Sequence, residues 1–123
     1  MDNIIGEVAL NRLGINNRRF NMKDHVLFIC SLNKDLSFNM IVNCDGRVKI
    51  WRFINTDLPK EYIGEHLKYS NPEYPGVIVG FEVTEECDLS CYAEQYIDIS
   101  SKNADLKIEN MLYGFLDFIN SIN

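Results

Sequence analysis

The sequence has no long hydrophobic run, and its first residues lack the features of an export signal. The longest uninterrupted apolar stretch is Val26 to Cys30, far short of the roughly 20 residues that cross a bilayer. The segment from Met1 to Glu7 contains two acids and a broken apolar stretch, whereas a secretory signal begins with positive charge. We therefore expect no signal peptide, no membrane span and no membrane partner.

Clustered positive charge is also missing. The formal net charge is −6, and residues 53–123 carry 13 acidic but only 4 basic side chains. Proteins that bind phosphate backbones normally present a concentrated basic face. We therefore expect no nucleic-acid partner, because the basic residues of the first half are few and dispersed: Arg18, Arg19, Arg47, Lys49 and Arg52.

No motif for catalysis or for metal binding is visible. The only two histidines, His25 and His66, fall in different predicted elements, and neither accompanies a nucleophile motif. Cys87 and Cys91 are separated by three residues, whereas a zinc knuckle usually has two. We therefore expect no enzyme, no cofactor and no metal site. Four cysteines without an export signal favour reduced thiols and a cytoplasmic location.

The residues that are present suit one globular domain, since 123 residues with 46% apolar content can form a single core. Helical spacing predicts a first helix over residues 2–13, ended by Gly14. Strands are expected over 25–32, 38–43 and 47–54, with Asp45-Gly46 as the tight turn of a hairpin. The Asn- and Arg-rich segment 16–22 is interpreted as a connector.

The second half predicts two helices around a strand pair. Pro59, after Thr56 and Asp57 as possible caps, predicts a helix that ends before residue 71, with Ile63 and Leu67 on its apolar stripe. Strands follow over 77–83 and 89–100, joined by an acidic turn. After Asp105 as a candidate cap, apolar residues recur at helical spacing to the end of the chain.

These elements predict one α+β domain over residues 1–123. The order αβββαββα implies a largely antiparallel sheet of about five strands with the helices packed on it.

The most informative feature is the acidic strand pair between Glu82 and Asp98. This stretch contains six acids and no Lys or Arg. Acids that alternate with aromatic residues on a pleated strand make a surface suited to a basic or amphipathic polypeptide. The residues predicted to share this surface and to contact a partner are Glu82, Tyr92, Glu94, Tyr96 and Asp98.

Trp51 is a second candidate for a partner contact. Strand parity groups it with Arg47, Lys49 and Phe53 on the side opposite Val48. Trp and Arg are enriched at binding hot spots. Two other interpretations remain open: the connector 16–22 covers the indole, or cation–π stacking makes it part of an ordinary surface.

A resemblance to a known family rests on the element order, on Leu13-Gly14-Ile15 after the first helix and on Leu58-Pro59 at mid-chain. In these features the chain resembles the YbjN and type III secretion chaperone-like superfamily. The resemblance implies a small acidic protein, often a dimer, that holds a partner polypeptide such as a secreted effector. A small immunity or antitoxin protein that neutralises a basic toxin, such as a nuclease, is the alternative, because such inhibitors are commonly acidic. An enzyme is the weakest interpretation.

Overall fold

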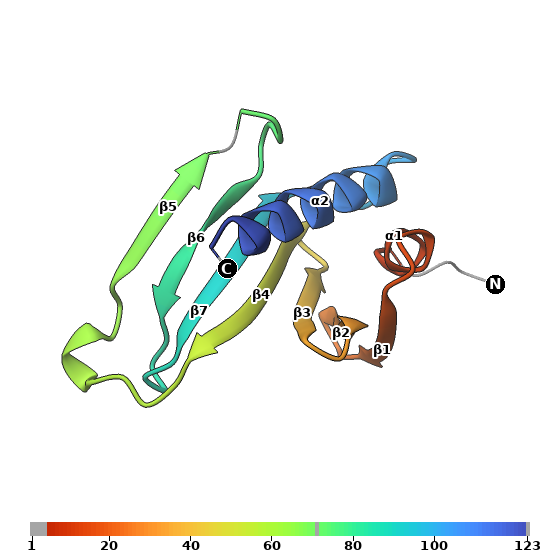
Figure 1. Cartoon of the computed structure of the whole chain (residues 1–123). Coiled ribbons are helices and arrows are strands. Elements are labelled where there is room, and N and C mark those ends of the chain that lie inside the picture. The colour runs from red at the N-terminus through yellow and green to blue at the C-terminus, as the bar shows by residue number, and fades with distance from the viewer. Residues whose placement is uncertain (1–4, 71, 123) are drawn as a thin grey trace.

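One antiparallel sheet organises the chain, and both α-helices lie on the same side of it (Figure 1). The computed structural model describes residues 5–70 and 72–122. The seven strands are ordered β1-β2-β3-β4-β7-β6-β5, so β7 pairs with β4 and the hairpin of β5 and β6 lies beyond it. The elements are α1 Glu7–Arg12, β1 Asn16–Asn21, β2 His25–Asn33, β3 Leu36–Asn43, β4 Arg47–Asn55, the 3-10 turn η1 Lys60–Tyr62, β5 His66–Ser70, β6 Ile78–Val83, β7 Leu89–Tyr96 and α2 Ala104–Ile122.

The hydrophobic core lies between the sheet and the helices. Because side chains alternate between the two faces of a strand, every second residue of the central strands points toward the helices. From α2, the ring of Phe115 packs 5.6 Å from that of Phe38 in β3. One fully buried row crosses neighbouring strands through Phe28, Met40, Ile50 and Ala93.

The hairpin of β3 and β4 and the long last helix are confirmed. At the hairpin turn, Gly46 has a φ of 95°, a region that other residues rarely adopt. A Cβ atom there would also collide with the carbonyl oxygen of Ile97. Glycine is therefore required at this turn for two independent reasons.

The prediction of a five-stranded sheet is wrong, because the described residues form a sheet of seven strands. One extra strand is β1, which the sequence presented as a connector. Its residues have low strand propensity, but pairing with the apolar strand β2 over six positions holds them extended. The chain thus gains an edge strand from a segment rich in Asn and Arg.

The second extra strand replaces the helix predicted after Pro59. Only the short turn η1 forms there, and Gly64 follows with a φ of 87°, which ends any helical path. Residues 66–70 then pair with β6. The supposed apolar stripe is not buried, since Ile63 is 40% and Leu67 is 60% exposed. Sheet pairing here outweighs a local helical pattern.

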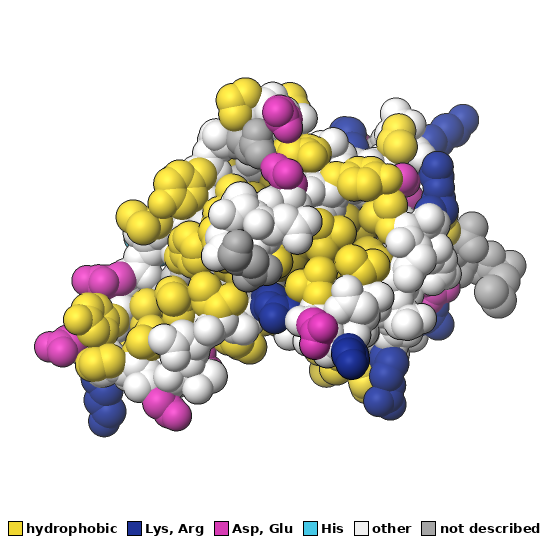
Figure 2. All heavy atoms as spheres, in the orientation of Figure 1, with side chains coloured by type: hydrophobic (Ala, Val, Ile, Leu, Met, Phe, Trp, Pro, Cys, Tyr) yellow, Lys and Arg dark blue, Asp and Glu magenta, His cyan; other side chains and the backbone are white. Residues whose placement is uncertain are grey.

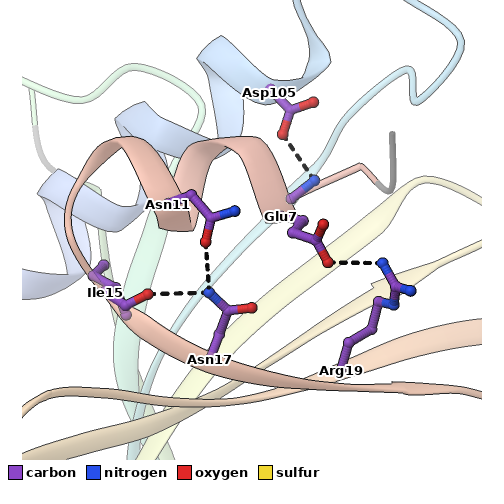
Figure 3. Close-up of polar contacts among 7 residues, drawn as sticks. Glu7, Asn11, Ile15, Asn17, Arg19 and Asp105 are labelled. Carbon is purple, nitrogen blue, oxygen red and sulfur yellow. Dashed lines mark hydrogen bonds and ion pairs between the residues drawn. The ribbon is translucent and has the colours of Figure 1, made fainter. Parts of the chain in front are cut away.

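The two helices are joined by a carboxylate. Asp105 was predicted to cap its own helix, but its Oδ1 accepts a 2.8 Å hydrogen bond from the backbone N–H of Gly6, just before α1 (Figure 3). It also accepts a longer bond, of 3.4 Å, from the backbone N–H of Ala9. Glu7 in turn accepts a bond from Arg19 of β1 at 2.7 Å. The first helix, which begins at Glu7 rather than residue 2, is thus anchored at its N-terminus; residues 2–4 of the predicted range lie outside the described residues.

Candidate functional site

The sheet face opposite α1 and α2, called the open face here, is not covered by any helix in the described residues. Strand register places one continuous row of open-face residues across all seven strands. In an antiparallel sheet with one buried face, the other face is usually polar. The row contains Arg18, Ile29, Asn39, Trp51, Tyr92, Gly80 and Lys68.

On the part of the open face formed by β1 to β4, exposed apolar side chains are interspersed with polar ones such as Arg18 and Asn39. Phe20 is 38%, Ile29 is 45% and Phe53 is 46% exposed. The register places the partly buried Leu27 and Ile41 beside them. A concentration of apolar side chains on a solvent-facing surface is typical of an interaction site.

The half formed by β4, β7, β6 and β5 is charged and is organised around Tyr92. Its side chain is only 3% exposed although it lies on the open face. The ammonium group of Lys49, in the neighbouring strand, lies 5.0 Å from the centre of the Tyr92 ring. The same group donates a 2.5 Å hydrogen bond to Glu82. Tyr92 is therefore covered by an ion pair between two flanking strands.

A shallow hollow of about 190 Å³ lies over this arrangement. Its polar walls carry both signs of charge, so it can accept a side chain of either sign from a partner. The hollow is lined by Lys49, Gly64, His66, Lys68, Glu82, Val83, Tyr92 and Glu94.

The environment of the hollow raises the pKa of the Tyr92 phenol. Burial is the main cause, and the negative charges of Glu82 and Glu94 add to it. The phenol is therefore harder to ionise than that of an exposed tyrosine.

Four of the five residues predicted on the acidic strand pair share one face, as expected. Register pairs Glu82 with Ser90 and Gly80 with Tyr92, so Glu82, Tyr92 and Glu94 point to the same side. Tyr96, which is 70% exposed, pairs with Arg47 at the end of this surface. Their role as partner contacts stays a prediction.

Asp98 lies apart from the other four, beyond the end of β7. Its carboxylate accepts hydrogen bonds from the Ser100 hydroxyl at 2.6 Å and the Ser100 backbone N–H at 3.0 Å. These bonds, the hydroxyl first, lower the pKa of Asp98. Asp98 therefore shapes the turn that leads into α2.

Trp51 lies on the open face with Lys49 and Phe53, as parity predicted. The segment 16–21 does not cover it, because β2 and β3 lie between β1 and β4. Trp51 pairs directly with Tyr92. The tryptophan site and the acidic strand pair, which the sequence presented as alternatives, are therefore neighbours on one surface.

The sequence did not single out Phe20, Ile29 and Ile41 as surface residues. Phe20 lies in the segment interpreted as a connector, and Ile29 lies within an apolar run. A run that is apolar at every position gives no parity signal. The exposed side of β2 therefore could not be read before the register was known.

A second group of acids gathers at one end of the sheet, where the loop before β5 meets the turn between β6 and β7. The Leu58 N–H donates to the carbonyl of Cys87 at 2.9 Å, which holds the two segments together. None of these acids has an ion pair among the described residues. This acidic end comprises Asp57, Glu61, Glu65, Glu85, Glu86 and Asp88.

His25 and His66 lie in different strands, β2 and β5. The Nδ1 atom of His25 is 2.7 Å from its neighbour Asp24. In the described ranges, no group of three or more His, Cys, Asp or Glu side chains is arranged to hold a metal ion. No helix in the same ranges has the length and apolar content needed to cross a membrane.

Comparisons with protein-family models, with curated proteins and with solved structures found no match to this chain.

Proposed function

We propose that this protein binds another polypeptide through the open face and holds or masks it, without carrying out chemistry on it. The observation that carries the proposal is the group of exposed apolar side chains on that face. Phe20, Ile29 and Phe53 are each more than a third exposed, because both helices lie on the other side of the sheet. A partner that covered these side chains would remove substantial apolar area from water.

The neighbouring charged half would supply specificity. Lys49 and Glu82 already neutralise each other, so this region suits a partner with matched polar groups better than a uniformly basic one. The aromatic residues Trp51 and Tyr96 are of the types that anchor interfaces. We therefore expect a partner segment whose apolar side chains pack on Phe20, Ile29 and Phe53 and whose polar groups lie over β7 to β5.

A role as an immunity protein that masks a basic toxin is the second candidate. The acidic end, whose carboxylates have no ion pair among the described residues, favours it because such a field speeds capture of a basic partner. The proposal includes a cytoplasmic location, which the four free cysteines support. It does not depend on the resemblance to secretion chaperones, since the element order behind that resemblance differs from the observed one.

Site-specific photocrosslinking in the cells that encode the protein tests the proposal. A photoreactive phenylalanine analogue at Phe53 or Tyr96 of the open face should crosslink one distinct polypeptide, identified by mass spectrometry. The matched control is the same analogue at Tyr113, which is 50% exposed on α2. Equal crosslinking from all three positions, or none from the open face, would contradict the proposal.

The two roles differ in their dependence on the acidic end. Once the partner is known, Glu85→Lys with Glu86→Lys should slow association severalfold at low salt if the partner is a basic toxin. For a partner held by the open face alone, the association rate should not change.

A further inference from the structure

The helix side of the sheet is not fully covered. Near its C-terminus, α2 packs on the sheet through Phe118, whose ring lies 5.2 Å from Phe81 and 6.4 Å from Tyr69. Figure 1 shows that the ends of β5 and β6 nearest η1 extend beyond the C-terminal end of α2. The helix layer therefore ends before the sheet does.

A groove of about 530 Å³ occupies this uncovered region. It is open to solvent rather than an enclosed cleft. Leu67 is 60% exposed, and Phe81, Val83 and Leu89 are only partly buried. We call it the distal groove; it is lined by Gly64, Glu65, His66, Leu67, Phe81, Val83 and Leu89.

The charge beside the distal groove is strongly negative. Glu65 belongs to both the groove and the acidic end. Within residues 57–65 and 84–88, six acids face a single cation, Lys60. Figure 2 shows acidic and hydrophobic side chains close together at this end of the molecule.

The C-terminus of α2 adds to this field. The C-terminal end of an α-helix carries a partial negative charge of about half a unit, which cations usually offset. The last turn of α2 contains no basic residue. The helix ends on the side of the sheet where the groove begins, because Phe118 contacts Phe81, a groove residue.

We propose that the distal groove binds a cationic amphipathic helix of a partner polypeptide. The apolar side chains of the partner helix would pack on Leu67, Phe81 and Leu89, so that this helix continues the layer that α2 begins. Its Lys and Arg side chains would lie beside the acidic end and the α2 C-terminus. Most of this surface lies on the opposite side of the sheet from the open face, although Gly64, His66 and Val83 also border the hollow over Tyr92. The inference does not rest on the open-face proposal, but it shares the acidic end with the immunity role.

A synthetic peptide that forms a Leu/Lys amphipathic helix is the probe, and binding is followed by fluorescence anisotropy and calorimetry. Wild-type protein should bind it with an affinity that falls as salt is raised. Leu67→Asp should weaken binding at least about tenfold, since it places a charge in the groove. Glu85→Lys with Glu86→Lys should weaken it severalfold and reduce the salt dependence.

Matched variants separate the groove from the rest of the surface. Leu106→Asp changes another exposed leucine, 57% exposed on α2, and should leave the affinity unchanged. Trp51→Ala on the open face should also have no effect. Bound peptide should slow alkylation of Cys87, in the turn of the acidic end, but not of the exposed Cys44. A loss of binding in Leu106→Asp equal to that in Leu67→Asp would overturn the proposal.

Three further outcomes also decide against it. Equal binding of a scrambled peptide of the same composition would show unspecific charge attraction. Preferential binding of a Leu/Glu helix would contradict the charge argument. A dimer that Leu67→Asp converts to monomer, seen by light scattering, would make a second copy of the chain the occupant.

Discussion

The two faces of the sheet use similar residue types for different purposes. On the helix-covered face, Phe28, Met40 and Ile50 are completely buried. On the open face, Ile29 and Phe53 lie on the same strands but are nearly half exposed. Apolar content alone therefore does not distinguish a residue that stabilises the fold from one that is available to a partner; the strand register does.

The largest expected effect comes from comparing one phenylalanine on each face. Phe28→Ala should lower the free energy of unfolding by about 3–5 kcal/mol, because a cavity remains in the core. Phe53→Ala, at a position 46% exposed, should cost about 1 kcal/mol or less. Urea unfolding followed by circular dichroism measures both. Similar losses would mean that the open face is not solvent-exposed in the free protein.

The next effect concerns the carboxylate that joins the helices on the covered face. Asp105→Ala removes the acceptor of two α1 backbone N–H groups, so stability should fall by about 1–3 kcal/mol. Hydrogen exchange should show faster exchange of α1 amides than of the central strands. Asp117→Ala, an exposed acid on the same helix, is the control and should change stability by less than about 0.5 kcal/mol.

A smaller effect is expected for the ion pair over Tyr92 on the open face. Lys49 and Glu82 are 24% and 33% exposed, so a double-mutant cycle with Lys49→Met and Glu82→Gln should give a coupling of about 0.5–1 kcal/mol. High salt should reduce it. The same cycle with Lys68→Met in place of Lys49→Met should give a coupling near zero. A coupling above about 2 kcal/mol would indicate that this half of the open face is buried after all.

The smallest expected effect is on the Tyr92 phenol. Burial is the main cause of its raised pKa, so Glu94→Gln should lower that pKa only slightly, as followed by NMR of the ring. Since a raised folded-state pKa lets the unfolded chain ionise first, stability falls as pH rises through the ordinary tyrosine value of about 10. A fall of the pKa to the ordinary value in Glu94→Gln would make charge, not burial, the cause.

The sequence was sufficient where local signals agree with the fold. Asp45-Gly46 defined the hairpin turn, and helical spacing defined α2. The parity of Glu82, Tyr92 and Glu94 was also predicted correctly, because alternation is clear in these strands. The sequence-based prediction was wrong at residues 66–70. Their apolar residues have helical spacing, but the segment forms strand β5 because it pairs with β6.

The candidate site could be predicted only in parts. The face on which Trp51 lies, and that of Tyr92, could each be predicted from its own strand. Their adjacency depends on the pairing of β4 with β7, which are separated in the sequence by β5 and β6. No local signal encodes which distant strand becomes a neighbour. The mixed charge of the surface follows from that pairing, since it brings Lys49 beside Glu94.

The row that crosses the open face ends in a cation at each edge of the sheet. Arg18 lies in the middle of edge strand β1, and Lys68 lies in the middle of edge strand β5. Edge strands expose unpaired backbone groups that invite other chains to extend the sheet, and a central Lys or Arg opposes this. When two copies approach edge to edge, like charges meet and both must lose their hydration. We therefore expect Arg18 and Lys68 to oppose edge-to-edge pairing of two copies at both edges of the sheet.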